Sequence, residues 1–238
     1  MTHEIHVVAR VDDHIDEGRL LAGLIAGRWQ APPDTAGLGY ANPDTGVRAS
    51  IEPLTTDGLP AGYVGLGMAL VLNYVRPAWF AIEAIQSFSG PVTAAGGLAF
   101  DPQMASTPGP PDPDALVASW VAGNDAAVRS ARATGAVLPW LDPARSSAWW
   151  RHQRALPQLR LAFAATHYVP SMRLIRRAGS DRVERAMSWP DAVPALLPET
   201  DRIVLLRSAA DTQLTIVGVA PAEAVRTSLE GLTERLVA

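Results

Sequence analysis

The sequence predicts an α+β protein whose N-terminal part is a ferredoxin-like antiparallel sheet with two helices. The first observation is that residues 63–75 alternate large apolar and small side chains, with the period of two that is typical of a strand. The second is that three further segments show the same alternation. The third is their order along the chain, strand, helix, strand, strand, helix, strand, which matches the ferredoxin-like arrangement. We expect the strands over residues 4–11, 40–53, 63–75 and 91–100, and the helices over 19–25 and 77–88.

The expected central strand, residues 63–75, separates large and small side chains onto opposite faces. Its small face consists of Gly65, Gly67, Ala69, Val71 and Asn73. Residues 58–75 contain no charged side chain, and such a run approaches the length of a membrane span. The glycines and the period-two alternation favour a buried strand instead. The helix that follows begins at Pro77, a residue that suits a first helical turn.

The proline-rich segment 101–114 predicts a stiff, extended connector. It divides the chain into a ferredoxin-like part, residues 1–100, and a second part, residues 115–238. In the second part we expect helices from Pro113 and Pro143, a second antiparallel β region and a C-terminal helix from Pro221. Its hairpins are expected to pair residues 171–177 with 182–189 and residues 203–207 with 213–219. We expect the two parts to pack into one body.

The sheet face that the two helices leave uncovered is the first candidate site. Its polar positions are His6, Arg10, Arg48, Glu52 and Asn73, around a floor of small residues. A low floor with a polar rim is what a ligand pocket needs. In an enzyme, His6 and Glu52 would be the acid–base pair and Arg10 or Arg48 would bind an anion. Alternatively, the second part of the chain or another protein covers this face.

The second candidate site is the helical run Trp149, Trp150, Arg151 and His152. Adjacent residues point about 100° apart on a helix, so at most one of the two tryptophans lies fully in the core. The other is available to a ligand or a partner, because Trp and Arg are common interface anchors. His152 has no neighbouring carboxylate to orient it as a general base.

The acidic segment 12–17 and Glu83 are both expected to have structural roles. Residues 12–17 are rich in oxygen ligands but lack the spacing of a calcium-binding loop, and acids there favour the start of a helix. Glu83 is expected on the surface of its helix. The sequence contains no phosphate-binding loop, dinucleotide fingerprint or hydrolase elbow. We therefore expect no metal and no cofactor.

Composition limits the functional classes. The net charge of −4 argues against a nucleic-acid partner, and the absence of Cys excludes disulfides and thiolate chemistry. All 20 basic residues are Arg. The start of the chain shows no secretion signal, so we expect a soluble cytoplasmic protein without a membrane partner.

The expected function is non-catalytic binding of another protein, as in an immunity-type or adaptor protein. The partner would be a toxin or a second copy of the chain. This expectation follows from the lack of any catalytic motif in a chain that carries several Trp and Arg residues. The alternative is a small-molecule enzyme that uses the uncovered face of the N-terminal sheet.

Overall fold

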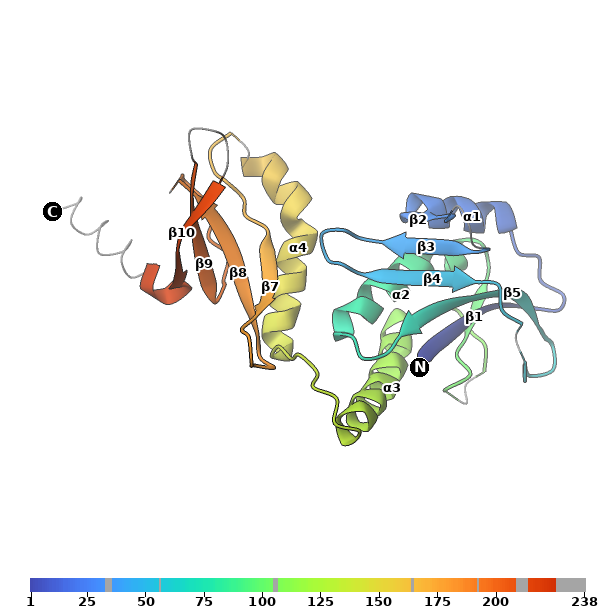
Figure 1. Cartoon of the computed structure of the whole chain (residues 1–238). Coiled ribbons are helices and arrows are strands. Elements are labelled where there is room, and N and C mark those ends of the chain that lie inside the picture. The colour runs from blue at the N-terminus through green and yellow to red at the C-terminus, as the bar shows by residue number, and fades with distance from the viewer. Residues whose placement is uncertain are drawn as a thin grey trace. The chain divides into compact units, whose positions relative to one another are not determined.

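The chain forms two compact units, residues Met1–Ala136 and Val137–Ala238, in the computed structural model (Figure 1). The model describes residues 1–32, 36–55, 57–104, 107–163, 165–191, 193–208 and 214–225. The division falls after Ala136 and not in the proline-rich segment 101–114, because helix α3 (Pro113–Ala133) packs on α2 (Ala78–Ala94) of the first unit.

The first unit contains one antiparallel sheet of six strands in the order β2-β3-β4-β5-β1-β6. Its strands are β1 (Thr2–Arg10), β2 (Trp29–Gln30), β3 (Leu38–Ala41), β4 (Arg48–Glu52), β5 (Tyr63–Asn73) and β6 (Leu98–Phe100). Helix α1 (Glu17–Ala26) contacts α2. The mixed helix-and-sheet class and the antiparallel sheet were predicted. The expected strand over residues 40–53 is divided into β3, which begins earlier at Leu38, and β4, and β2 lies outside the expected strands.

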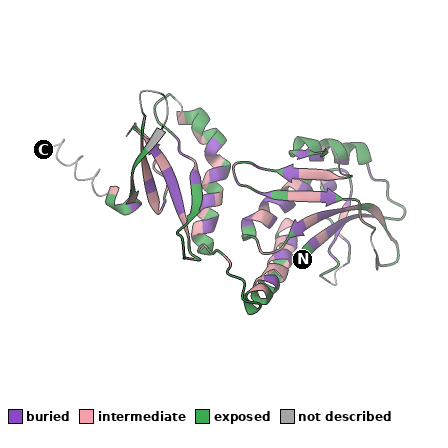
Figure 2. Ribbon diagram, viewed as in Figure 1, coloured by how far each residue is buried: buried purple, intermediate pink, exposed green. Residues whose placement is uncertain are grey.

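The core of the first unit follows from the predicted alternation. Ile5 of β1 pairs with Leu70 of β5, which pairs with Ile51 of β4, and all three side chains are buried. Figure 2 shows buried residues along these strands. Because residues opposite each other on neighbouring strands share a face, these strands present a continuous apolar surface. Helix α2 contributes fully buried Ile85 and Phe88 to the same core.

The alternation fails in the first half of β5. His6 of β1 pairs with Ala69 and Val8 pairs with Gly65, so three residues of β5 lie opposite one residue of β1. This irregularity is a β-bulge, and Gly67 within it has a φ of +68°, a conformation that favours glycine. Val64, predicted on the apolar face, is 46% exposed.

The predicted strand 91–100 is wrong over most of its length. Helix α2 continues through Pro91 to Ala94, and only Leu98–Phe100 is extended. Packing explains the longer helix, since Gly23 of α1 lies so close to Pro91 that a methyl group on Gly23 would stand 3.1 Å from the proline Cβ. The chain then turns at Gly96, whose φ is +81°.

Helix α3 approaches the sheet through Gly123. A Cβ atom on Gly123 would stand 2.6 Å from Cζ and 2.8 Å from Cε1 of Tyr74. The Tyr74 ring has little room to move, because its hydroxyl bonds with Nδ1 of His3 at 3.0 Å. The missing side chain at Gly123 therefore permits α3 to pack closely here.

We expect Gly123→Ala to destabilise the protein by about 1–3 kcal/mol, the usual cost of overpacking. An exposed helical Gly→Ala change normally stabilises by up to about 1 kcal/mol, so the two effects have opposite signs. Urea unfolding measures both. The matched control is Gly90→Ala in α2, where a Cβ would meet no atom within 4 Å and stabilisation is expected. Stabilisation by Gly123→Ala would contradict this packing.

The second unit combines α4 (Pro143–Phe163) with a four-stranded sheet of order β10-β9-β8-β7. Its strands are β7 (Met172–Arg176), β8 (Val183–Pro190), β9 (Arg202–Ser208) and β10 (Leu214–Pro221). The two predicted hairpins are present as antiparallel pairs. However, β8 and β9 are parallel, so the expectation of a purely antiparallel region is wrong. Residues 191–201 make the connection, about the length that a parallel crossover requires.

Two further expectations concern the C-terminal helix and membrane-spanning segments. Residues 222–225 are helical, and the remainder of the predicted C-terminal helix lies outside the described residues. In the part of the chain that the structure describes, no helix combines the length and the apolar character needed to cross a membrane.

Candidate functional site

A cavity of about 250 Å³ lies in the first unit, where β5 ends and α2 begins. We call it the arginine pocket. It is lined by Gly46, Arg48, Leu72, Asn73, Arg76, Phe80, Ala81 and Trp120. Leu72, Ala81 and Trp120 are buried and form an apolar floor. The polar residues of the lining, two arginines and one asparagine, are exposed and form a rim.

The two rim arginines bring positive charge to the pocket. Neither Arg48 nor Arg76 forms an ion pair with any residue that the structure describes. The guanidinium of Arg76 lies 5.7 Å from the centre of the Phe80 ring. Two guanidinium groups above an apolar floor favour an anion that has an apolar body, because guanidinium binds oxyanions by charge-assisted hydrogen bonds.

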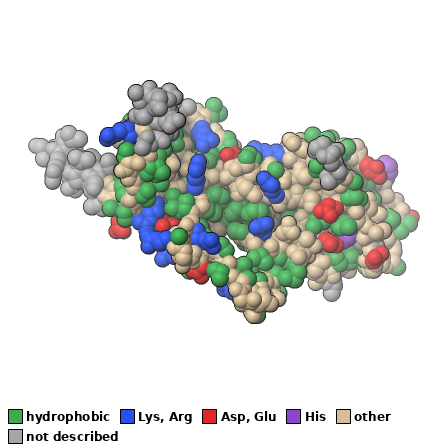
Figure 3. Space-filling view, in the orientation of Figure 1, with side chains coloured by type: hydrophobic (Ala, Val, Ile, Leu, Met, Phe, Trp, Pro, Cys, Tyr) green, Lys and Arg blue, Asp and Glu red, His purple; other side chains and the backbone are tan. Residues whose placement is uncertain are grey.

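These arginines are unusual for their surroundings. The first unit contains 7 Arg and 14 acidic residues, whereas the second contains 13 Arg and 10 acidic residues. Basic side chains accordingly gather on the second unit in Figure 3. A pair of unpaired arginines at one cavity of an acidic unit is therefore a local feature and does not reflect a generally basic surface.

Asn124 of α3 fixes the backbone from which Arg76 extends. Its Oδ1 accepts hydrogen bonds from the N–H groups of Val75 at 2.6 Å and Arg76 at 3.2 Å, and its Nδ2 donates to the Arg76 carbonyl at 3.2 Å. Val75 has a φ of +60°, a conformation that is strained for a β-branched residue. Such strain persists only where the surroundings enforce it, and it concentrates at functional sites.

Glu83 of α2 fixes the opposite rim. Its Oε1 accepts hydrogen bonds from Tyr40 at 2.8 Å, Asn42 at 2.6 Å and Thr45 at 3.0 Å. These bonds hold the β3–β4 turn that leads into Arg48. Glu83 is buried, so its expected surface position is wrong. Burial, together with the hydrogen bond to Glu83, raises the pKa of Tyr40 to about 12.

Behind the floor lies a buried polar chain. Trp120 packs on Tyr74 with ring centres 6.1 Å apart, and the Tyr74 hydroxyl bonds with His3, whose Nε2 lies 3.2 Å from Asp101. Burial acts to raise the pKa of Asp101, but hydrogen bonds from His3 and Ser119 outweigh it and lower that pKa. This chain ties the sheet to α3. Because His3 is fully buried, the chain presents no reactive group to a ligand. The sequence analysis did not predict this buried polar chain, although the strand period places His3 on the same face as the core residues.

The structure brings two of the predicted sheet residues, Arg48 and Asn73, into the arginine pocket. The predicted acid–base pair lies elsewhere. His6 and Glu52 flank Ala69 on opposite neighbouring strands, so their Cα atoms are about 10 Å apart. Nε2 of His6 lies 3.6 Å from Glu4, and burial lowers the pKa of His6.

Two residues of the second candidate site, Trp149 and His152, help to hold the second unit together. The indole of Trp149 donates to the Met172 carbonyl at 3.0 Å, and Nε2 of His152 lies 3.0 Å from the Pro170 carbonyl oxygen. Trp149 is buried. These contacts attach α4 to the start of β7 and give Trp149 and His152 structural roles.

The other face of α4 carries Trp150, Arg151 and Arg154. The guanidinium of Arg154 lies 5.0 Å from the centre of the Trp150 ring, a cation–π arrangement. Arg151 is exposed, and so is Arg10 at the end of β1 in the first unit. Neither Arg151 nor Arg10 lines the arginine pocket.

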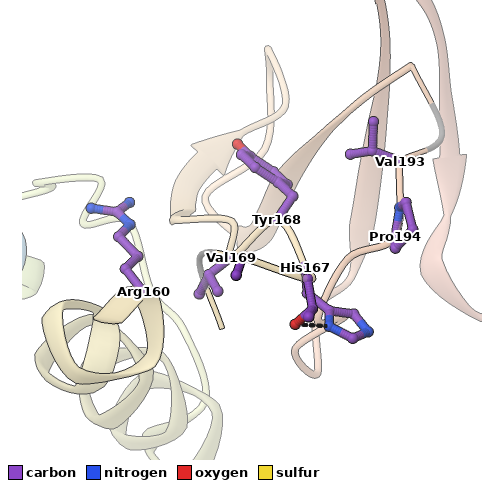
Figure 4. A pocket seen from close by; sticks show the side chains of 8 residues that line it. Arg160, His167, Tyr168, Val169, Val193 and Pro194 are labelled. Carbon is purple, nitrogen blue, oxygen red and sulfur yellow. Dashed lines mark hydrogen bonds between the residues drawn. The ribbon is translucent and has the colours of Figure 1, made fainter. Parts of the chain in front are cut away.

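The second unit has a larger but shallower hollow of about 710 Å³, shown in Figure 4. Arg160 reaches it from α4, and His167 and Tyr168 reach it from the segment after that helix. The His167 ring bonds with Thr166 at 2.9 Å and points away from Arg160. The polar groups that line this hollow do not converge on one point, so the hollow is a weaker candidate site than the arginine pocket.

Within the described ranges, no three His, Asp or Glu side chains come together as metal ligands. In α1, Asp16 accepts a hydrogen bond from the Arg19 N–H at 2.8 Å, the capping role that the sequence indicated for the acidic segment. Comparison with known proteins found no matching family model, no matching curated protein and no matching solved structure.

Proposed function

We propose that this protein binds a small organic anion in the arginine pocket of its first unit. The observation that carries the proposal is the pair Arg48 and Arg76, which lack carboxylate partners among the described residues and stand beside Asn73 above a buried apolar floor. A cavity of about 250 Å³ suits a small molecule, since sites for drug-sized ligands begin at about 300 Å³.

The proposed role is recognition without catalysis. The described residues that line the pocket include no His, Asp, Glu, Cys, Ser or Tyr side chain. General acid–base catalysis needs a group that exchanges protons near neutral pH within hydrogen-bond reach of the substrate. Arginine stays charged at all ordinary pH values and binds anions without exchanging a proton.

The fold is part of the proposal. We propose that the first unit is an enlarged ferredoxin-like sheet. The order β4-β5-β1-β6 with its two intervening helices supports this, and the β2–β3 pair extends the sheet beyond β4. In this arrangement the pocket lies at the end of the sheet, and the predicted open face is a separate surface.

We expect Arg48→Ala and Arg76→Ala each to weaken the binding of benzoate or phenyl phosphate about tenfold or more. A charge-assisted hydrogen bond contributes about 1.5–3 kcal/mol, and tenfold corresponds to about 1.4 kcal/mol. Isothermal titration calorimetry measures the affinities. Because both side chains are exposed, the melting temperature should change little.

Arg10→Ala is the matched control. It removes the same charge from an exposed position of the same unit but leaves the pocket intact. Its affinity should equal that of the unaltered protein. An equal loss in all three variants would show a general charge effect, and failure of every anion to bind would refute the proposal.

A second candidate function is docking of another protein, such as a toxin or a second copy, on the outer face of α4. The stacked pair Trp150 and Arg154 beside exposed Arg151 favours it, because Trp and Arg are the residues most enriched at binding hot spots. Native mass spectrometry of the protein purified from its host tests it. A partner in fixed stoichiometry supports docking, and a monomer without a partner argues against it.

A further inference from the structure

We infer that the ligand of the arginine pocket is a phosphate monoester with a small, flat organic group. Its phosphate would lie between Arg48 and Arg76, and its organic group would lie on the floor beside Trp120. This inference rests on the proposed function and adds the chemical class of the ligand.

The first argument concerns the amount of charge. Among the described residues, the lining contains two guanidinium groups and no carboxylate. A carboxylate ligand offers one negative charge to these two cations, whereas a phosphate monoester carries nearly two at neutral pH. Three phosphate oxygens also allow each guanidinium to make its own hydrogen bonds while Asn73 donates to a third acceptor.

The second argument concerns the start of α2. Pro77 occupies the N-cap position, where no side chain caps the helix, and Phe80 of the first turn lines the pocket. The positive end of the helix dipole therefore lies beside the two arginines. Phosphate groups bind commonly at such helix ends, where the dipole and free N–H groups both favour negative charge.

The third argument concerns an unsatisfied donor. Trp120 lines the cavity and is fully buried, and its indole N–H has no acceptor among the residues that the structure describes. A buried donor without an acceptor is rare in folded proteins and calls for an explanation. Because this nitrogen is itself fully buried, an oxygen of the ligand reaches it only if the Trp120 ring or a neighbouring side chain moves on binding.

The apolar floor specifies the organic part. Leu72 and Ala81 are buried beside Trp120, and the Phe80 ring completes the wall. A flat ring would pack on these side chains, and the volume of about 250 Å³ limits the ligand to about one ring with its phosphate. Inorganic phosphate would leave this surface unused.

Phenyl phosphate and phenyl sulfate provide a matched pair of probes. Both carry a tetrahedral head group on the same ring, but the sulfate has one negative charge and the phosphate nearly two. In calorimetric titrations at pH 7.5, we expect phenyl phosphate to bind at least about tenfold more tightly than phenyl sulfate and than inorganic phosphate. The affinity for phenyl phosphate should fall below pH 6, because its phosphate group takes up a proton with a pKa near 6 and loses one negative charge. The affinity for phenyl sulfate should stay constant over this range.

The outcomes separate this inference from the proposed function. Equal affinities for phenyl phosphate, phenyl sulfate and benzoate, all weakened by Arg48→Ala, would overturn the phosphate assignment and leave the anion pocket standing. Inorganic phosphate that binds as tightly as phenyl phosphate would identify an adventitious ion only and overturn the inference. Tighter binding of a phosphotyrosine peptide than of phenyl phosphate would also overturn it, in favour of a protein ligand. Phosphate binding that Arg48→Ala and Arg76→Ala leave unchanged would overturn both.

Discussion

Replacement of Glu83 by alanine should lower the free energy of unfolding of the first unit by about 3–5 kcal/mol, because each buried donor that loses its acceptor costs about 1–3 kcal/mol. The change removes the acceptor for three buried donors, Tyr40, Asn42 and Thr45. It should also abolish anion binding, because the turn that leads into Arg48 would lose its attachment to α2. Urea unfolding followed by circular dichroism measures the first effect, and calorimetric titration measures the second.

Glu52→Ala is the control for Glu83→Ala. Glu52 is an exposed carboxylate on β4 that accepts a hydrogen bond from Ser50 at 2.7 Å. Its loss should change the free energy of unfolding by no more than about 0.5 kcal/mol, as is usual for surface substitutions. If Glu83→Ala were as mild as Glu52→Ala, the Glu83 network would not hold the rim of the pocket.

The second large effect is expected in the second unit, where Asp201→Ala should cost about 3–5 kcal/mol. Asp201 pairs with Arg145 of α4 and with Arg185 of β8, and the Arg185 side chain is only 2% exposed. Nε and Nη1 of Arg185 already lack acceptors among the described residues. Removal of the aspartate would leave this buried guanidinium with the exposed carboxylate of Glu199, 3.1 Å from Nη2, as its counter-ion.

Hydrogen exchange of the β8 amides measures this effect locally. The control is Glu184→Ala, which removes the half-buried carboxylate that pairs with Arg202 at 3.0 Å on the neighbouring strand. Ion pairs that water can reach contribute little because water screens them, so β8 should keep most of its protection in this variant. Similar losses of protection in both variants would contradict the importance of the buried Asp201 pair.

Much of the fold could be predicted because burial on one face produces a visible period in the sequence. Ile5, Ile51 and Leu70 occupy the positions that the alternation assigns to the core, and the hairpins of the second unit follow from their turns. Pro91 misled the prediction because a proline inside a helix loses a hydrogen bond. Packing of Pro91 against Gly23 compensates for that loss, and no local pattern reveals such a contact.

The pocket could be predicted only in part. Arg48 and Asn73 were identified because they are polar positions on strands, and the polar face of a strand can be read from its period. Arg76 and Trp120 were missed as site residues because their proximity depends on how α3 packs on α2. Glu83 was misplaced for a similar reason, since its three donors come from a turn about 40 residues earlier in the chain.

The parallel pairing of β8 with β9 shows the same limit. The strands themselves were predicted, but their relative direction depends on the path of residues 191–201. The prediction that the two units pack into one body remains a prediction, and so does its consequence, a single cooperative unfolding transition.

A crystal structure of the protein with phenyl phosphate tests the central claim most directly. We expect the phosphate oxygens to lie about 2.7–2.9 Å from guanidinium nitrogens of both Arg48 and Arg76, the distance typical of charge-assisted hydrogen bonds. The phenyl ring should lie against Trp120. A ligand bound at any other place, with both arginines free of contact to it, would contradict the claim.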